Sequence, residues 1–75
     1  MLLNLKKVEK ARKDAKKSVT EMGVLMGMNG ASYWKKENGI HSFNANELPV
    51  LMKSLGKDIN DLPEFFLYED LPKSK

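Results

Sequence analysis

Apolar residues recur at helical spacing through most of this 75-residue chain. The clearest stripe consists of Leu48, Leu51, Met52 and Leu55, which follow the i, i+3, i+4, i+7 pattern of a helix with one buried face. Similar patterns predict further helices over residues 3–16, 19–26 and 30–38, with a short one after Asp58. We therefore expect a single small all-α domain, because a chain of this length holds one core.

Turn and capping residues divide the segment from Ser18 to Gly39 into two short helices. Ser18 and Glu21 form the capping-box pattern that opens a helix, and Gly27 is a typical residue to end it. Asn29 then caps a second helix, which ends at Gly39. Two such helices, joined by a turn of about three or four residues that contains glycine, form a helix-turn-helix arrangement.

Two residues in the predicted helices need a particular neighbour, and a proline determines which asparagine caps a third helix. Gly23 costs up to about 1 kcal/mol relative to alanine in a helix interior, so we expect another helix to approach it closely. Arg12 lies in the apolar stripe of the first helix and needs a carboxylate partner. Asn46 rather than Asn44 is expected to cap the following helix, because Pro49 is tolerated only in a first turn.

The formal net charge of +3 is unevenly distributed along the chain. Residues 1–17 carry seven lysines and arginines against two acids, whereas residues 57–75 carry three lysines against five acids. A basic N-terminal region suits a polyanion such as nucleic acid. A solvated helix face is the more common outcome for a lysine run, and on charge alone it is the favoured interpretation.

Composition leaves few residues for catalysis or metal binding. The chain has no cysteine, one histidine and no glycine-rich phosphate loop, so we expect no enzyme activity, no metal, no cofactor and no small-molecule substrate. The lack of cysteine fits a reducing cytoplasm. The longest apolar stretch is far shorter than the roughly 18 residues of a membrane span, and residues 1–7 do not form a signal peptide. We therefore expect a cytoplasmic protein without membrane association.

Several of these residues keep the order and spacing of a known family, and the chain resembles the Cro/repressor helix-turn-helix proteins of lambdoid phages. The shared positions, which lie between Leu5 and Leu62, are Arg12, Ser18, Gly23, Gly27, Tyr33, Glu37-Asn38-Gly39 and Leu55-Gly56. The resemblance implies a compact five-helix, lambda-repressor-like DNA-binding domain over residues 1–66, followed by a C-terminal tail over residues 67–75. It also implies that Arg12 pairs with Glu37.

The resemblance assigns DNA contacts residue by residue. The base-reading positions are Asn29, Gly30, Ala31, Ser32 and Lys35. The phosphate-contacting positions are Lys16, Lys17, Ser18, Thr20, Asn38 and His41. Two positions depart from the family, since Val19 stands where a glutamine is usual and Lys36 where an aliphatic residue is usual. We therefore expect few side chains to read bases directly.

These features predict sequence-specific binding of double-stranded DNA by a transcriptional regulator of the phage or prophage Cro type, in a bacterial cell. A homodimer is expected on a pseudo-palindromic site, with Phe65, Phe66, Leu67 and Tyr68 as the dimer surface. The alternative is a protein-interaction module on the same fold, such as an antitoxin, an anti-repressor or an inhibitor of a host regulator. Trp34 is expected to pack half-buried on the helix flank, with contact to DNA or a partner as the alternative.

Overall fold

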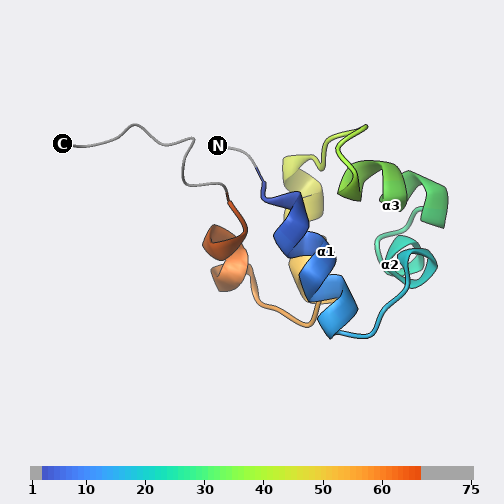
Figure 1. Ribbon diagram of the computed structural model, residues 1–75. Coiled ribbons are helices and arrows are strands. Elements are labelled where there is room, and N and C mark those ends of the chain that lie inside the picture. Colours follow the sequence, from blue (N-terminus) through green and yellow to red (C-terminus); the bar gives the residue numbers. More distant parts are fainter. Residues whose placement is uncertain (1–2, 67–75) are drawn as a thin grey trace.

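Short helices make up most of residues 3–66, the part of the chain that the computed structural model describes (Figure 1). The elements are α1 (Leu5–Asp14), α2 (Val19–Leu25), α3 (Gly30–Glu37), the 3-10 helix η1 (Ala45–Glu47), α4 (Leu48–Ser54) and the 3-10 helix η2 (Ile59–Phe65). This part of the chain has no strand, and Leu3 and Phe66 form an isolated antiparallel β-bridge. The expected compact, mostly helical structure is confirmed, although α1 is shorter at both ends than residues 3–16.

Side-chain caps begin α2 and α3 at the predicted residues. The Ser18 hydroxyl accepts a hydrogen bond from the backbone N–H of Glu21 at 3.0 Å, and the Glu21 carboxylate accepts one from the N–H of Ser18 at 2.7 Å. Asn29 Oδ1 accepts a hydrogen bond from the N–H of Ser32 at 2.7 Å. These bonds satisfy backbone donors that have no partner within a helix, so the sequence positions both helix starts locally.

The prediction for the helix that contains Pro49 was wrong at its cap. Neither predicted asparagine caps α4, whose N-cap position is Glu47 and has no side-chain cap. Asn44 instead caps the preceding helix η1, where it exchanges two hydrogen bonds with Glu47, at 3.0 and 3.1 Å. The short helix η1 lies between this cap and α4, so Pro49 still occupies the first turn of α4. A proline in that position leaves no helical hydrogen bond unmade, because the first N–H groups of a helix have no partner.

All four α-helices end in a Schellman motif, in which a residue of positive φ reverses the chain. The residue after it donates its N–H to the carbonyl five positions earlier. The residue of positive φ is glycine in three motifs, Gly27 (74°), Gly39 (82°) and Gly56 (75°), and it is Lys16 (59°) at the end of α1. A residue with a side chain pays roughly 1–2 kcal/mol in this conformation, so Lys16 is a strained position.

Gly23 is buried because the turn after α2 folds back over it. A Cβ added to Gly23 would lie 2.8 Å from the carbonyl carbon and oxygen of Asn29 and 2.9 Å from the carbonyl oxygen of Met28. The N–H of Met28 also donates to the Gly23 carbonyl at 2.8 Å. The close neighbour is therefore the backbone of the turn before α3, and not a neighbouring helix as the sequence suggested.

The core joins α1, α2, α3, α4 and η2. It consists of Val8, Met22, Tyr33, Leu51, Met52, Leu55 and Phe65. In Figure 1, α1 crosses the bundle with α2 and α3 on one side and η2 on the other. Helix α3 is thus held against a hydrophobic core along one side only.

Phe65 was predicted to lie on a dimer surface, but the structure places its side chain in the core. This side chain is 5% exposed and packs in the core, because η2 turns it back towards α1 and α4. Phe66 is half-buried and pairs with Leu3 through the β-bridge. Leu67 and Tyr68 lie outside the described residues. Phe65 therefore stabilises the monomer and is not available as a contact surface.

A buried ion pair connects α1 to α3. Arg12 Nε and Nη2 donate to the two carboxylate oxygens of Glu37 at 2.9 and 3.1 Å, and the Tyr33 hydroxyl donates to the same carboxylate at 2.7 Å. Arg12 Nη1 donates to the carbonyl of Lys17 at 3.0 Å. The hydrogen bonds to Glu37 raise the pKa of Arg12, and burial raises the pKa of Tyr33. This is the pair that the resemblance implied, and it fixes the inner side of α3.

A second, partly buried ion pair joins α3 to η1. Lys36 Nζ lies 2.8 and 3.0 Å from the two carboxylate oxygens of Glu47 and donates to the carbonyl of Ser42 at 3.2 Å. Burial alone would raise the pKa of Glu47, but the hydrogen bonds from Lys36 and the backbone of Asn44 lower it. The lysine that departs from the family pattern therefore has a structural partner, which the sequence analysis missed.

Candidate nucleic-acid interface

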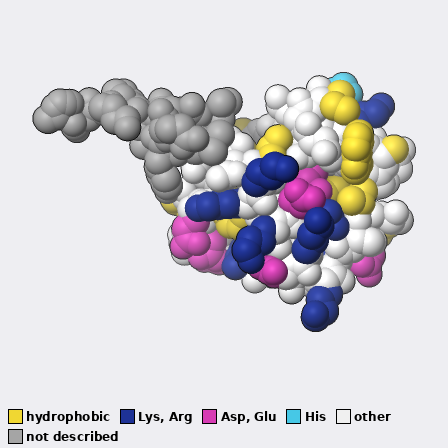
Figure 2. Space-filling view, viewed as in Figure 1, with side chains coloured by type: hydrophobic (Ala, Val, Ile, Leu, Met, Phe, Trp, Pro, Cys, Tyr) yellow, Lys and Arg dark blue, Asp and Glu magenta, His cyan; other side chains and the backbone are white. Residues whose placement is uncertain are grey.

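The outer face of α3, defined by Ala31, Trp34, Lys35 and Asn38, is the part of the predicted reading segment that solvent reaches. These four residues recur at helical spacing and are exposed, whereas the buried residues of α3 lie on its other side. Figure 2 shows hydrophobic side chains gathered over α3. Trp34 is 47% exposed, so about half of its surface is free for contact with another molecule.

The five predicted base-reading residues are not equally accessible. Ala31 and Lys35 lie on the outer face of α3, and Asn29 is exposed at its N-terminal end. The Oδ1 atom of Asn29 is used by the cap, which leaves its amide group free to donate. Ser32 and Gly30 are half-buried. The structure therefore exposes three of the five.

Gly30 is half-buried because it packs against α2. A Cβ at this position would lie 3.1 Å from Thr20 Oγ1 and 3.2 Å from Thr20 Cα. Such distances are too short for an ordinary contact, so the neighbouring helix would have to move. Gly30 therefore lets α3 begin close to α2, and Thr20, a predicted phosphate contact, lies beside the start of α3.

The N-terminal end of α2 and the turn before it hold three further predicted phosphate contacts, Lys16, Lys17 and Ser18, of which Lys17 is half-buried. Ser18 is exposed, but its hydroxyl and N–H are both engaged with Glu21. The Glu21 carboxylate stabilises the helix start, but it places a negative charge where a phosphate would approach. Lys16, just before α2, is exposed, and its side chain makes no hydrogen bond or ion pair within residues 3–66. Of these predicted contacts, Lys16 is therefore the one with an exposed and unengaged side chain.

Acidic partners neutralise part of the basic N-terminal region. Lys10 pairs with Asp14 and Lys13 with Glu9, each at 3.0 Å, and the hydrogen bond from Lys13 lowers the pKa of Glu9. Figure 2 shows the same alternation of basic and acidic side chains on the surface. With Arg12 paired to Glu37 as well, this region presents less free positive charge than the sequence suggested.

Asn38 and His41 lie at the C-terminal end of α3. Asn38 Nδ2 donates to the carbonyl of Trp34 at 2.9 Å, and the backbone N–H of His41 donates to the carbonyl of Lys35 at 3.2 Å. Both side chains are exposed. Thr20 and Asn29 are at one end of α3, whereas Asn38 and His41 are at the other, so predicted contact residues lie at both ends of the helix.

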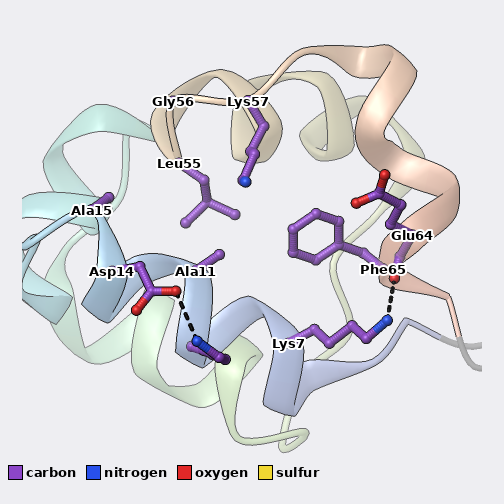
Figure 3. A pocket seen from close by; sticks show the side chains of 10 residues that line it. Lys7, Ala11, Asp14, Ala15, Leu55, Gly56, Lys57, Glu64 and Phe65 are labelled. Carbon is purple, nitrogen blue, oxygen red and sulfur yellow. Dashed lines mark hydrogen bonds and ion pairs between the residues drawn. The ribbon is translucent and has the colours of Figure 1, made fainter.

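A hollow of about 410 Å³ lies between α1, the end of α4 and η2 (Figure 3). Leu55 and Phe65 contribute apolar surface, and Lys57 reaches over them. Lys7, on its rim, donates to the carbonyl of Glu64 at 3.0 Å. Within residues 3–66 no group of three or more histidine, cysteine, aspartate or glutamate residues could hold a metal ion. None of the residues that line this hollow is a predicted DNA contact.

Comparisons of the chain with protein-family models, with curated proteins and with solved structures found no match. Among residues 3–66, no helix has the length and apolar character needed to cross a membrane. The described part of the protein is a small, mostly helical domain in which the outer face of α3 is exposed. The inner side of that helix is fixed by the Arg12–Glu37 ion pair.

Proposed function

We propose that the protein binds double-stranded DNA through a helix-turn-helix formed by α2 and α3, with the outer face of α3 in the major groove, and acts as a transcriptional regulator. The observation that carries this proposal is the charge of that face. Lys35 makes no ion pair within residues 3–66, and Glu37, the acid of α3, is buried against Arg12. A polyanion can therefore approach the outer face without meeting a carboxylate of α3.

The dimensions of α3 suit this docking mode. An α-helix with its side chains is about 10–12 Å in diameter, and the major groove of B-DNA, about 12 Å wide, admits such a helix. Lys35 can donate to the O6 and N7 acceptors of guanine, and the free amide group of Asn29 can donate to a base acceptor. Asn38 at the C-terminal end of this face, His41 beyond it and Lys16 before α2 supply phosphate contacts that carry no sequence information.

A salt-dependent titration with DNA tests the proposal. Trp34 is the single tryptophan of the chain, so its fluorescence reports on ligands that meet the outer face of α3. Selection from a random duplex pool is expected to enrich a short sequence with two-fold symmetry, since two copies on a pseudo-palindrome bind more tightly than one. Affinity for it should fall steeply as salt rises. No duplex binding at low salt would refute DNA binding, and binding without an enriched sequence would refute specific regulation.

Three lysine variants separate base reading from phosphate contact. Lys35→Ala is expected to change the selected sequence, whereas Lys16→Gly should weaken binding to all sequences alike. Glycine is chosen because it accommodates the positive φ at this position, so weaker binding cannot be attributed to a damaged fold. Lys53→Ala removes an exposed lysine of α4 and serves as the matched control with unchanged sequence preference.

A protein-interaction module is the second candidate, favoured by the apolar exposure of α2. Val24 is 72% exposed and Leu25 is also exposed, on the helix that packs against α3. Exposed apolar side chains that form a contiguous patch indicate contact with another protein. On this candidate the fluorescence of Trp34 stays unchanged with every duplex at every salt concentration, so the DNA titration distinguishes the two.

A further inference from the structure

We infer that the outer face of α3 recognises thymine by its methyl group, through Ala31 and Trp34. This inference rests on the proposed DNA binding and adds the chemistry by which bases are distinguished. In the major groove, the C5-methyl of thymine is an apolar group that a side chain can contact without a hydrogen bond. A reading face built from apolar groups would therefore favour thymine-containing steps.

Hydrogen-bonding groups near this face are largely engaged within the protein. Asn29 Oδ1 accepts from Ser32, and Asn38 Nδ2 donates to the carbonyl of Trp34. The bidentate contact that asparagine makes with adenine needs both of its polar atoms. The bond that each asparagine already makes leaves a second lone pair or amide hydrogen free, but it fixes the orientation in which the side chain can meet adenine. Lys35 remains as the charged donor of the outer face.

Apolar groups occupy the centre of the same face. Ala31 and Trp34 are three residues apart on α3, so their side chains are neighbours on one side of the helix. Ala31 is exposed and Trp34 is 47% exposed, although burial in the monomer core would be the usual position of an indole. The alanine methyl and the indole together offer a surface on which thymine methyl groups can be removed from water.

The charge of the face favours DNA over a protein as the occupant. Lys35 follows Trp34 directly, and α3 exposes no carboxylate. The phosphates of a duplex supply a negatively charged partner for Lys35, which has none within residues 3–66. The thymine methyl groups of the same duplex supply apolar surface that Trp34 and Ala31 can cover.

Replacement of thymine by uracil tests the inference directly. Uracil pairs with adenine as thymine does but has no C5-methyl group, so the exchange removes the apolar contact and leaves the hydrogen-bonding edges in place. The duplex selected above is labelled with a fluorophore, and binding is followed by anisotropy, because the Trp34 variant has no tryptophan of its own. Each contacted thymine that is replaced is expected to weaken binding by about fourfold, the effect of one buried methyl group.

Variants assign this discrimination to the two residues. Ala31→Gly and Trp34→Gln should each reduce the preference for thymine over uracil, while Lys35→Ala, the matched control on the same face, should weaken binding and keep the preference. Helical circular dichroism checks that each variant is folded. If one of the two apolar variants fails to fold, the other still tests the assignment.

Four results are distinguishable. Loss of the thymine preference in both apolar variants supports the inference. Equal affinity of the wild-type protein for thymine and uracil duplexes, with sequence selection intact, overturns the inference and leaves the proposed function standing. A wild-type preference that Ala31→Gly and Trp34→Gln both retain overturns the assignment to these residues. Absence of duplex binding at every salt concentration overturns the proposed function and the inference together.

Discussion

Replacement of Glu37 by glutamine would remove the charge that faces Arg12 inside the domain. The side chains of Arg12 and Glu37 are 11% and 4% exposed, so little water can compensate. The glutamine amide nitrogen also cannot accept the hydrogen bonds that Arg12 and Tyr33 donate to the carboxylate. Loss of one partner of a buried pair costs about 3–5 kcal/mol. A domain of 75 residues has a free energy of unfolding of roughly 4–11 kcal/mol, at about 0.05–0.15 kcal/mol per residue.

Urea unfolding followed by helical circular dichroism measures this loss. Glu37→Gln is expected to lower the midpoint sharply with an unchanged dependence on urea concentration. In the double variant Arg12→Met/Glu37→Gln both charges are absent, so it should be less destabilised than the sum of the two single variants. Asp14→Asn removes the exposed pair with Lys10 and should leave the midpoint unchanged. A wild-type midpoint for Glu37→Gln, or single losses that simply add, would refute the reasoning.

Three further substitutions test other features of the fold. Lys16→Gly is expected to stabilise the domain by about 0.5–1 kcal/mol, because relief of the left-handed conformation exceeds the added entropy of the unfolded chain; a lower thermal midpoint would contradict this. Gly23→Ala should lower the midpoint although alanine is the better helix former, because its Cβ would lie 2.8 Å from the backbone of Asn29; a higher midpoint would show that the turn can yield. Tyr33→Phe should cost about 1.5–3 kcal/mol at neutral pH through the hydrogen bond to Glu37. Because burial raises the pKa of Tyr33, the folded state keeps the phenol proton when the unfolded chain releases it. The stability that Tyr33 contributes is therefore fully present below about pH 10 and decreases above it, so wild type and Tyr33→Phe should converge in unfolding scans above about pH 10. A constant difference would contradict the assignment.

Helix ends could be predicted where one or two neighbouring residues determine them. Ser18 with Glu21, and Asn29 alone, cap their helices through bonds that span three residues, so the sequence contains the whole signal. Asn44 and Glu47 form a capping box over the same three-residue spacing, but Pro49 favoured Asn46, because the short helix η1 before α4 was not expected. The ion pair of Glu47 with Lys36 on α3 was missed for a tertiary reason, because no local pattern shows a contact between residues eleven positions apart.

The exposed positions of α1 and α3 could be predicted from helical spacing, whereas the burial of Phe65 in η2 could not. Positions on the outer face of α3 follow from a period of 3.6 residues. The loss of free charge on α1 could also have been found, because Lys10 with Asp14 and Glu9 with Lys13 are four residues apart. Phe65, however, is buried only because a 3-10 helix that contains Pro63 turns it inward, and its aromatic neighbour in the sequence suggested a surface patch instead.

The bonds that hold α3 in place all lie on the side away from its outer face. Glu37 binds Arg12 of α1 and accepts the hydrogen bond of Tyr33, Lys36 binds Glu47, and the turn before α3 packs over Gly23. Ala31 and Lys35, by contrast, make no side-chain bond within residues 3–66. Substitutions on the outer face should therefore change binding with little effect on the free energy of unfolding, whereas those on the inner side should do the reverse. Separation of the contact residues from the stabilising residues would allow substitutions on the outer face to change its binding preference, because the residues that hold the fold together stay the same.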